Sequence, residues 1–353
     1  MLTIGKLLDK SLVICVGAGG VGKTTTAASL ALGAAIRKRR AAVITVDPAR
    51  RLKDALGLDD LTIEPRRVQV NGANFDALAL DVKRTFDGVI RRFAPMPAVA
   101  DRILANRLYQ ELSNELAGSA EYMAMEKLHE MAETRHYDLI VVDTPPSSHV
   151  QDLLAAPNRL TSLLASSAVS LLQAPSTLLS LTDSRLGKLT LSALLKGLQR
   201  WTGLDLLRDL SDFAAAFEGM TEGFSTRAAE VDDLLRSPET AFVLVTTLEP
   251  HTIDTTIRFH AQLAEGGFRV AGIIANRVVA FPEVGEVQAS VEESLRSKLM
   301  ANYSDLRELS RRDQRALRLL HRQTGCPLLA AVPVNSEGPT SLAALEGFAK
   351  QLL

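Results

Sequence analysis

The stretch LVICVGAGGVGKTT, residues 12–25, decides the fold of this chain. Its first five residues are apolar, and the next eight, from Gly17 to Thr24, satisfy the pattern G-x-x-x-x-G-K-[ST]. Helical periodicity follows over residues 23–37. Glycines let the backbone turn so that successive N–H groups point at phosphate oxygens, and the helix adds the positive end of its dipole. We therefore predict a buried strand, a phosphate-binding loop and a helix, in that order.

The same loop predicts how a nucleotide is held. We expect Lys23 to bridge the β- and γ-phosphates and so to act in catalysis, and the Thr24 hydroxyl to bind Mg²⁺. The predicted nucleotide-binding residues of the loop are Gly19, Gly20, Val21, Gly22, Lys23, Thr24 and Thr25.

Two acidic residues come directly after apolar runs farther along the chain. Asp47 follows AAVITV, and Asp143 follows LIVV. A carboxylate at the carboxyl end of a parallel strand faces the crevice where ligands bind in such sheets. We expect Asp143 to hold Mg²⁺ as a Walker-B acid, and Asp47 to join the metal site and to orient or deprotonate the attacking water. The alternative for either residue is a turn or helix cap.

The apolar runs outside the loop indicate the fold class. Most are rich in Val and Ile and lack polar alternation, which is typical of strands buried on both faces of a parallel sheet. Helix-like segments, including residues 252–264 and 342–352, lie between or after them. We predict an α/β fold with a doubly wound, mostly parallel sheet. The seven predicted strands are 12–16, 41–46, 75–80, 139–142, 241–246, 270–275 and 328–332, of which 75–80 also suits an edge strand.

Two intervals are too long to be plain connections. Residues 82–136 and 149–238 show helical periodicity and little strand signal, so we expect helical insertions there. Within the second, the leucine-rich residues 160–210 suit either helices packed on one another or an exposed surface for an apolar client. Residues 292–322 predict a solvated amphipathic helix.

Composition excludes several classes of protein. Forty basic and forty-one acidic side chains give a net charge of −1, so nothing indicates nucleic acid as a partner. Two cysteines, Cys15 and Cys326, exclude a disulfide framework and a self-contained four-cysteine zinc site. The uncharged stretch 160–182 contains nine Ser or Thr residues and a proline, so it is a poor transmembrane candidate. We expect a cytoplasmic protein without a secretory signal.

Three motifs together resemble those of the arsenical-pump (ArsA) and tail-anchored-protein targeting ATPase family. They are the loop at residues 17–25, D-P-A at residues 47–49 and D-T-P-P at residues 143–146. The similarity covers nearly the whole chain, and AGSAE at residues 117–121 resembles the family's P-G-x-D-E element. This dimeric branch of P-loop NTPases has a deviant Walker-A loop. The resemblance implies one nucleotide domain over residues 1–353 with an inserted helical subdomain, ATP and Mg²⁺ as ligands, and ATP-driven opening and closing of a dimer.

The resemblance also implies where the base lies. Asn276 matches the family's adenine-recognising asparagine, and Pro333 matches the proline of its adenine loop. A guanine-specific relative would show Asn-Lys-x-Asp, whereas this chain has Asn-Arg-Val-Val at residues 276–279, with no acid. We therefore expect ATP rather than GTP.

The chain departs from the family pattern in three places. The second lysine of the deviant loop, which reaches the partner's nucleotide, is replaced by Ala18. The C-x-x-C zinc clip of the targeting members is missing, and Cys15, on a buried strand, is most simply a core residue. The family's D-P-A-H-S reads D-P-A-R-R, so Arg50 and Arg51 are either a surface pair or phosphate ligands.

The leading functional hypothesis is a Mg-dependent ATPase that couples hydrolysis to opening and closing of a dimer. Its partner is a second copy or a paralogue that carries the signature lysine, and its client is a hydrophobic protein segment, a partner ATPase or a membrane complex. The alternative is a partitioning or positioning ATPase that acts on a surface. That alternative predicts a terminal membrane helix or a basic DNA patch, but residues 342–353 hold only one lysine and one acid. An iron–sulfur reductase is excluded because the cysteine ligands are lacking.

Overall fold

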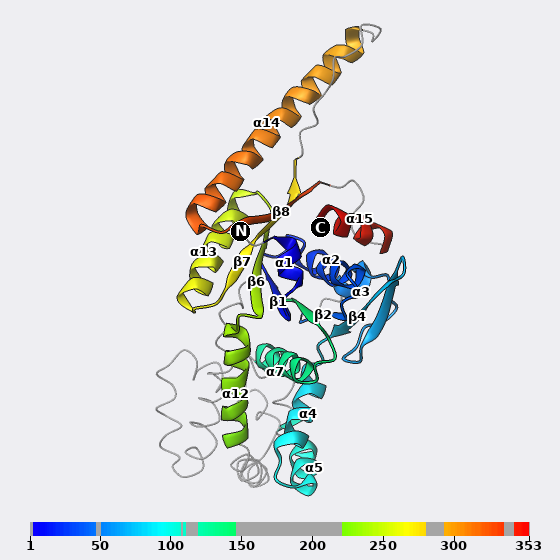
Figure 1. Cartoon of the computed structure of the whole chain (residues 1–353), viewed down its shortest axis with the longest axis vertical. Coiled ribbons are helices and arrows are strands. Elements are labelled where there is room, and N and C mark those ends of the chain that lie inside the picture. Colours follow the sequence, from blue (N-terminus) through cyan, green and yellow to red (C-terminus); the bar gives the residue numbers. More distant parts are fainter. Residues whose placement is uncertain are drawn as a thin grey trace, which may run out of the picture.

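An eight-stranded sheet forms the centre of the molecule (Figure 1). The structure is a computed structural model, and it describes residues 3–46, 51–106, 109–110, 119–145, 221–279, 293–334 and 342–352. The strand order is β3-β4-β2-β5-β1-β6-β7-β8, and every neighbouring pair is parallel except β3 and β4. The strands are β1 (Leu12–Val16), β2 (Ala41–Thr45), β3 (Arg66–Val70), β4 (Ala73–Ala79), β5 (Leu139–Asp143), β6 (Thr240–Thr246), β7 (Val270–Val278) and β8 (Leu328–Pro333).

The predicted α/β fold with a mostly parallel sheet is confirmed. Each of the seven predicted strands corresponds to an observed strand, but β3 was missed. β3 pairs antiparallel with β4 and takes the edge position. The strand β4 therefore lies inside the sheet, although the alternation of its sequence also suited an edge strand. The turn between them consists of Asn71 and Gly72, whose φ angles are 46° and 83°. An Asn-Gly pair with both φ angles positive is the preferred two-residue hairpin turn, because its twist matches that of the strands.

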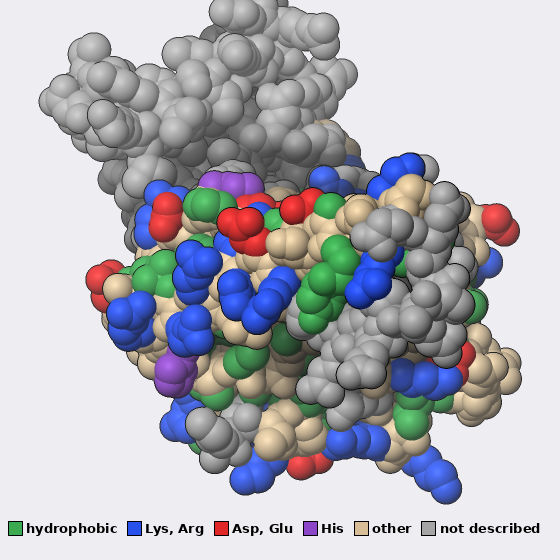
Figure 2. All heavy atoms as spheres, turned by 90° about the horizontal axis from the view of Figure 1, so that it is seen from above, with side chains coloured by type: hydrophobic (Ala, Val, Ile, Leu, Met, Phe, Trp, Pro, Cys, Tyr) green, Lys and Arg blue, Asp and Glu red, His purple; other side chains and the backbone are tan. Residues whose placement is uncertain are grey.

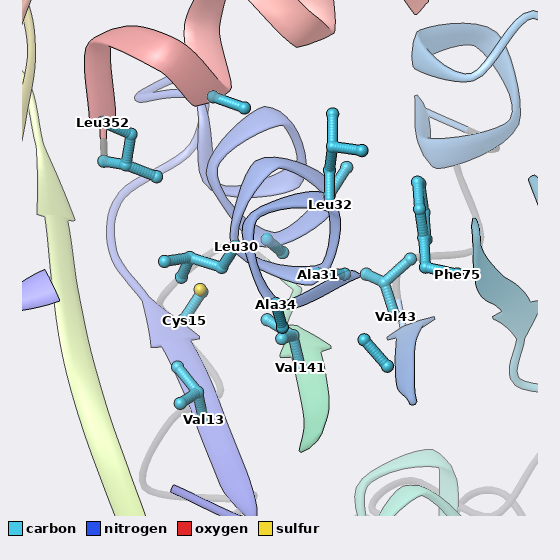
Figure 3. Packing of buried hydrophobic residues seen from close by; sticks show 14 of the residues in the cluster. Val13, Cys15, Leu30, Ala31, Leu32, Ala34, Val43, Phe75, Val141 and Leu352 are labelled. Atoms are coloured by element: carbon cyan, nitrogen blue, oxygen red, sulfur yellow. The ribbon is translucent and has the colours of Figure 1, made fainter. Parts of the chain in front are cut away.

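Helices cover both faces of the sheet. One face carries α1 (Ile4–Leu8), α2 (Lys23–Ile36), α3 (Arg51–Ala55) and α15 (Leu342–Leu352). Within α2, every residue except Thr24 and Ile36 is buried, and its alanines let it lie close to β1, β5 and β2 (Figure 3). The other face carries α7 (Ser119–Glu133), α12 (Thr221–Arg236), α13 (Pro250–Glu265) and part of α14 (Glu293–Thr324). The strands between these two layers are therefore buried on both sides, which explains their continuous apolar sequences.

A third apolar cluster lies away from the sheet. It joins α4 (Val82–Phe93), α5 (Pro97–Ala105) and the start of α7, with Phe86 and Tyr109 in ring contact at 5.4 Å between centroids. These helices fall within residues 82–136, as expected. Most of the second predicted insertion, including the leucine-rich residues 160–210, lies outside the described residues, and α12 falls near its end. The division into one domain with two insertions stays a prediction.

The second half of the helix α14 packs against the rest of the molecule, whereas its first half is exposed to solvent. The helix confirms the one predicted over residues 292–322, and its second half packs Ala316 and Leu320 against the sheet layer. Its first half projects away from the body (Figure 1). In the part of the chain that the structure describes, no helix is both long enough and apolar enough to cross a membrane.

Candidate active site

The phosphate loop leaves the carboxyl end of β1, between β5 and β6 in the middle of the sheet. Gly17 packs so closely against the Val245 carbonyl of β6 that a Cβ atom would collide with it. Gly22 has a φ of 92°, and a Cβ there would lie 2.6 Å from the Asn276 Nδ2 atom. These two glycines are therefore required by the path of the loop. Gly19 and Gly20 lie exposed at its tip, whereas Val21 and Thr25 are buried beneath it.

Lys23 begins α2 and folds back over the loop. Its Nζ atom donates to the carbonyl oxygens of Gly17, at 2.9 Å, and Ala18, at 2.8 Å. The residue is only 6% exposed. Its ammonium group thus lies on the inner side of the loop, as the sequence predicts for a phosphate-binding lysine.

Asp143 links the loop to two strands. Its Oδ2 atom accepts from the Thr24 hydroxyl at 2.8 Å and from the Thr45 hydroxyl at 3.0 Å. Asp143 ends β5, Thr45 ends β2, and Thr24 is the second residue of α2, so the parallel sheet brings all three to one edge. The structure therefore brings together two of the three predicted metal-site residues, Thr24 and Asp143.

This arrangement fits a magnesium ion chemically. Hydroxyl and carboxylate oxygens are the ligands that Mg²⁺ prefers. The Thr24 hydroxyl donates its proton to Asp143, which leaves the lone pairs of its oxygen available to a cation.

Asp47, the third predicted metal-site residue, lies outside the described residues, as does Arg50. The last described residue before them is Val46, whose N–H donates to the Asp143 carbonyl oxygen at 3.0 Å. Val46 therefore lies beside Asp143. Arg51 begins α3 and is exposed.

Asn276 lies behind the loop rather than at the surface. Its Nδ2 atom donates to the Val21 carbonyl at 2.8 Å and to the Thr26 hydroxyl at 3.3 Å, and the residue is 3% exposed. Its Oδ1 atom is buried and has no hydrogen-bond partner among the described residues. Because Val21 offers an acceptor, the amide nitrogen must face it, and an acceptor is left over. Pro333 ends β8 and pairs with Val278 at the end of β7. Asn276 and Pro333, the two residues predicted near the base, therefore lie near the carboxyl ends of neighbouring strands.

Cys15 is a core residue, as its place on β1 suggested. The side chain is fully buried beneath α2 (Figure 3). Burial raises the pKa of its thiol, and the nearby Asp143 carboxylate raises it further. A thiol in such surroundings stays protonated and unreactive. Cys326 is buried in the apolar cluster on the opposite face of the sheet, so the two cysteines do not form a common site.

A group of buried threonines near the loop was not predicted. Thr246 ends β6, and its hydroxyl accepts from Thr256 of α13 at 2.9 Å. Thr252 donates to the carbonyl oxygen of Thr247 at 2.9 Å. These bonds fasten the start of α13 to the strand whose Val245 carbonyl packs on Gly17. No motif marks them, and the only signal was their position after a buried strand.

Arg227 joins α12 to α7, two helices that cover the same face of the sheet. It is 3% exposed and forms ion pairs with Glu126 at 2.9 Å, Glu133 at 3.0 Å and Glu230 at 3.1 Å. Hydrogen bonding by Arg227 lowers the pKa of Glu133 to about 2, whereas burial raises the pKa of Glu126 in spite of Arg227.

His129 lies beside this network, and its side chain together with Glu133 and Glu230 could offer three metal ligands. The geometry argues against that use. Arg227 already binds both carboxylates, and the ring atom nearest Glu133 is Nδ1 whereas the one nearest Glu230 is Nε2. One cation cannot bind both ring nitrogens, and it would lie beside a guanidinium. The cluster is therefore a set of ion pairs.

Comparison with known proteins agrees with this geometry. The sequence profile of the anion-transporting ATPases (ArsA type) matches residues 10–307. The chain belongs to this family. It is similar to the ATPase GET3 of Malassezia globosa, with 26% identity over 309 residues, covering 86% of this chain and 85% of the relative. The ATPase get3 of Aspergillus terreus is 26% identical over 306 residues, covering 83% and 80%. The ATPase ASNA1 homolog 1 of Paramecium tetraurelia is 32% identical over 142 residues, covering 40% and 42%.

The resemblance drawn from the loop and the two acidic motifs is thus confirmed. The protein is a nucleotide-binding P-loop ATPase of the anion-transporting family.

Proposed function

We propose that this ATPase uses Mg²⁺ to bind and hydrolyse ATP at the loop, and that the nucleotide state opens and closes a dimer which acts on a protein client. The observation that carries the proposal is the convergence of Lys23, Thr24 and Asp143 at one edge of the sheet. A fixed ammonium, a hydroxyl and a buried carboxylate are what phosphoryl transfer with a divalent cation requires.

The chain's own groups have distinct roles in this proposal. Lys23 exchanges the carbonyl oxygens of Gly17 and Ala18 for phosphate oxygens, which places a positive charge where negative charge develops. Thr24 and Asp143 hold Mg²⁺, which when bound neutralises charge on the phosphates. Asp47 orients the attacking water. The support for this last role is its position one residue beyond Val46, whose amide bonds to Asp143.

In this proposal the base lies beside Asn276 and Pro333, and the Asn276 Oδ1 atom, which is buried behind the loop, becomes accessible to it when the nucleotide binds. The acceptor left on Asn276 Oδ1 suits the exocyclic amino group of adenine, which is a donor. The corresponding atom of guanine is an oxygen acceptor, and two acceptors would repel each other. ATP is therefore the proposed substrate, in agreement with the absence of an acid in residues 276–279.

The helical side would transmit the nucleotide state. Asp143 ends the strand that leads toward the second insertion, and α12 and α7 are joined by Arg227. In this proposal, α7 and α12 move between two arrangements as the nucleotide state changes, and this movement acts on a hydrophobic client. The other subunit of the dimer is a second copy or a lysine-bearing paralogue. A cytoplasmic location stays a prediction.

The test combines nucleotide preference with a conformational readout. ATP and GTP binding and hydrolysis are measured on the full chain with and without Mg²⁺. Hydrogen exchange in α7 and α12 is then compared between ADP and a non-hydrolysable ATP analogue with Mg²⁺. We expect preference for ATP, dependence on Mg²⁺ and a different exchange rate in the two states. Equal binding of ATP and GTP would refute the base assignment, and identical exchange would refute the coupling.

A further inference from the structure

The projecting half of α14 carries a row of exposed leucines. Leu295, Leu299, Leu306 and Leu309 are 51%, 46%, 42% and 39% exposed. Large apolar side chains that recur on one side of a helix mark a contact surface, because scattered ones would show no period.

The row of exposed leucines continues into the packed second half of α14. The spacings between these leucines are four, seven and three residues, and with Asn302 in the gap they alternate between four and three, which is the heptad repeat of a coiled coil. In the second half of the helix, the same row is buried against the body at Asp313, Ala316 and Leu320. The seam positions, in order, are Leu295, Leu299, Asn302, Leu306, Leu309, Asp313, Ala316 and Leu320. One continuous seam is therefore covered over its second half and exposed over its first.

The charge of the exposed half favours a protein over an anionic membrane. Residues 293–309 contain three basic side chains and three acidic ones, so their charges cancel. The basic ones are Arg296, Lys298 and Arg307, and the acidic ones are Glu293, Asp305 and Glu308. A membrane-surface helix usually has an excess of basic residues on its polar face. The face from which α14 projects also carries hydrophobic side chains among its basic ones (Figure 2).

We propose that this seam binds a second copy of the chain, with the two α14 helices antiparallel. In the register that places Leu295 opposite the second copy's Leu306, and Leu299 opposite its Asn302, one flank of the seam pairs Lys298 with Asp305 twice, once from each copy. The other flank pairs Arg296 with Tyr303, so no like charges meet there. Among the described residues, no ion pair joins Lys298 or Asp305 to another part of the chain.

Other arrangements lose these charge pairs. Sliding the antiparallel register by one heptad sets Asp305 against Asp305 and Lys298 against Arg312 in one direction, and Lys298 against Lys298 in the other. In a parallel pair, the flanking partner of Lys298 is Tyr303 and that of Asp305 is Ser310. Opposite charges at flanking positions set the register and orientation of coiled coils, so they select the first arrangement.

The seam lies on an element separate from the phosphate loop, so this association does not depend on nucleotide or on the proposed function. The free half of the helix is also held in place by its packed half, so pairing need not form the helix. Because only a few layers are shared, the dimer should be weak, with a Kd on the order of micromolar to tens of micromolar.

The test is sedimentation of the full chain without nucleotide over about 1 to 100 μM. The unmodified chain should form a reversible dimer. Leu299→Glu with Leu306→Glu should raise its Kd by roughly tenfold or more. The matched control is Met300→Glu with Ser304→Glu, which adds the same charge on the outer side of the same helix and should change Kd by less than about twofold. Thermal midpoints verify that each variant is folded.

Charge exchange tests the register itself. Lys298→Glu alone and Asp305→Lys alone should each raise the Kd by roughly tenfold, because each places like charges opposite one another. An equimolar mixture of these two variants should dimerise again, and so should the double variant. A chain that stays monomeric at about 100 μM, or single variants that the mixture does not rescue, would overturn the proposal. Dimerisation unaffected by the seam variant would place the contact elsewhere and overturn it equally.

Discussion

The buried Asp143 carboxylate is the residue on which three elements converge. Since Oδ2 accepts from both Thr24 and Thr45, replacing it with an amide weakens two hydrogen bonds and removes the charge that would hold Mg²⁺. We predict that Asp143→Asn raises the Mg²⁺ concentration for half-maximal ATPase activity by about tenfold or more. A magnesium titration of steady-state hydrolysis measures this.

The matched control lies at the opposite end of the same strand. Asp138 precedes β5 and pairs with Arg40 at 2.6 Å, away from the loop. Asp138→Asn should leave the magnesium titration unchanged. If the two variants titrate alike, Asp143 does not hold the metal.

Lys23 is the second prediction at this scale. Lys23→Ala removes the charge that the loop carbonyls of Gly17 and Ala18 hold in place. We predict that ATP hydrolysis falls by roughly 100-fold or more, since the phosphates lose their main fixed cation. Lys6→Ala, an exposed lysine on α1, is the control and should keep the parental rate. Parental activity in the Lys23 variant would remove this residue from the active site.

At the scale of elements, the sequence predicted the buried strands well and the edge strand badly. Short uninterrupted runs rich in Val and Ile are typical of strands that are buried on both faces of a sheet. The strand β3 exposes three of its five residues, so its apolar signal reduces to Val68 and Val70. The Asn71-Gly72 pair was the available sign, because a two-residue turn with positive φ specifies a hairpin.

The site was predictable to the extent that it is local. Lys23 and Thr24 follow from one contiguous motif, and Asp143 follows from a strand end. The bond from Asn276 to Val21 joins residues 255 positions apart, and the threonine bonds behind Gly17 depend on the packing of α13 against β6. Such contacts arise from the tertiary fold, and a single sequence contains no periodic signal for them.

The junction of α7 and α12 gives the prediction at the element scale. Arg227→Met would leave the buried Glu126 without its partner, and breaking a buried pair in this way typically costs about 3–5 kcal/mol. We predict a fall of roughly 5–10 °C in the thermal midpoint at neutral pH. The control is Arg91→Met on α4, whose pair with Asp101 is exposed at both residues and should matter little.

The pH dependence of that loss has a definite sign. Burial already raises the pKa of Glu126 in the intact protein, and removing Arg227 raises it further. An acid with a raised folded pKa destabilises the fold when ionised, and this cost disappears as the pH falls through that pKa. Arg227 also holds the pKa of Glu133 at about 2 in the intact protein, and the stability that this provides is lost in the variant at pH 5 and at pH 8 alike, because both values lie above the ordinary pKa of the group. The deficit of Arg227→Met should therefore be smaller at pH 5 than at pH 8. A deficit that grows on acidification would contradict this account of Glu126.

At the scale of the whole molecule, the two proposed contacts between subunits have different consequences. The seam on α14 would keep two copies near each other in every nucleotide state. Closure around ATP would be a separate event at the loops. A heterodimer with a lysine-bearing paralogue would make the two sites unequal, because this chain could receive a lysine but not supply one.

Substitutions at Ala18 test whether this chain needs a lysine from a second subunit. Its carbonyl accepts from Lys23 at 2.8 Å and its methyl packs against the core, so the position offers a subunit across the dimer no charge. Cations supplied by a second subunit can contribute 10³–10⁵ in rate in related NTPases. We predict slow hydrolysis by the chain alone and a gain of at least about tenfold in Ala18→Lys. Ala18→Met, of similar length but uncharged, should give no gain, and Arg50→Ala and Arg51→Ala should not lower the rate. Fast hydrolysis by the unmodified chain that survives both arginine variants would show that no charge from a partner is needed, and a fall in either variant would assign that charge to the arginine.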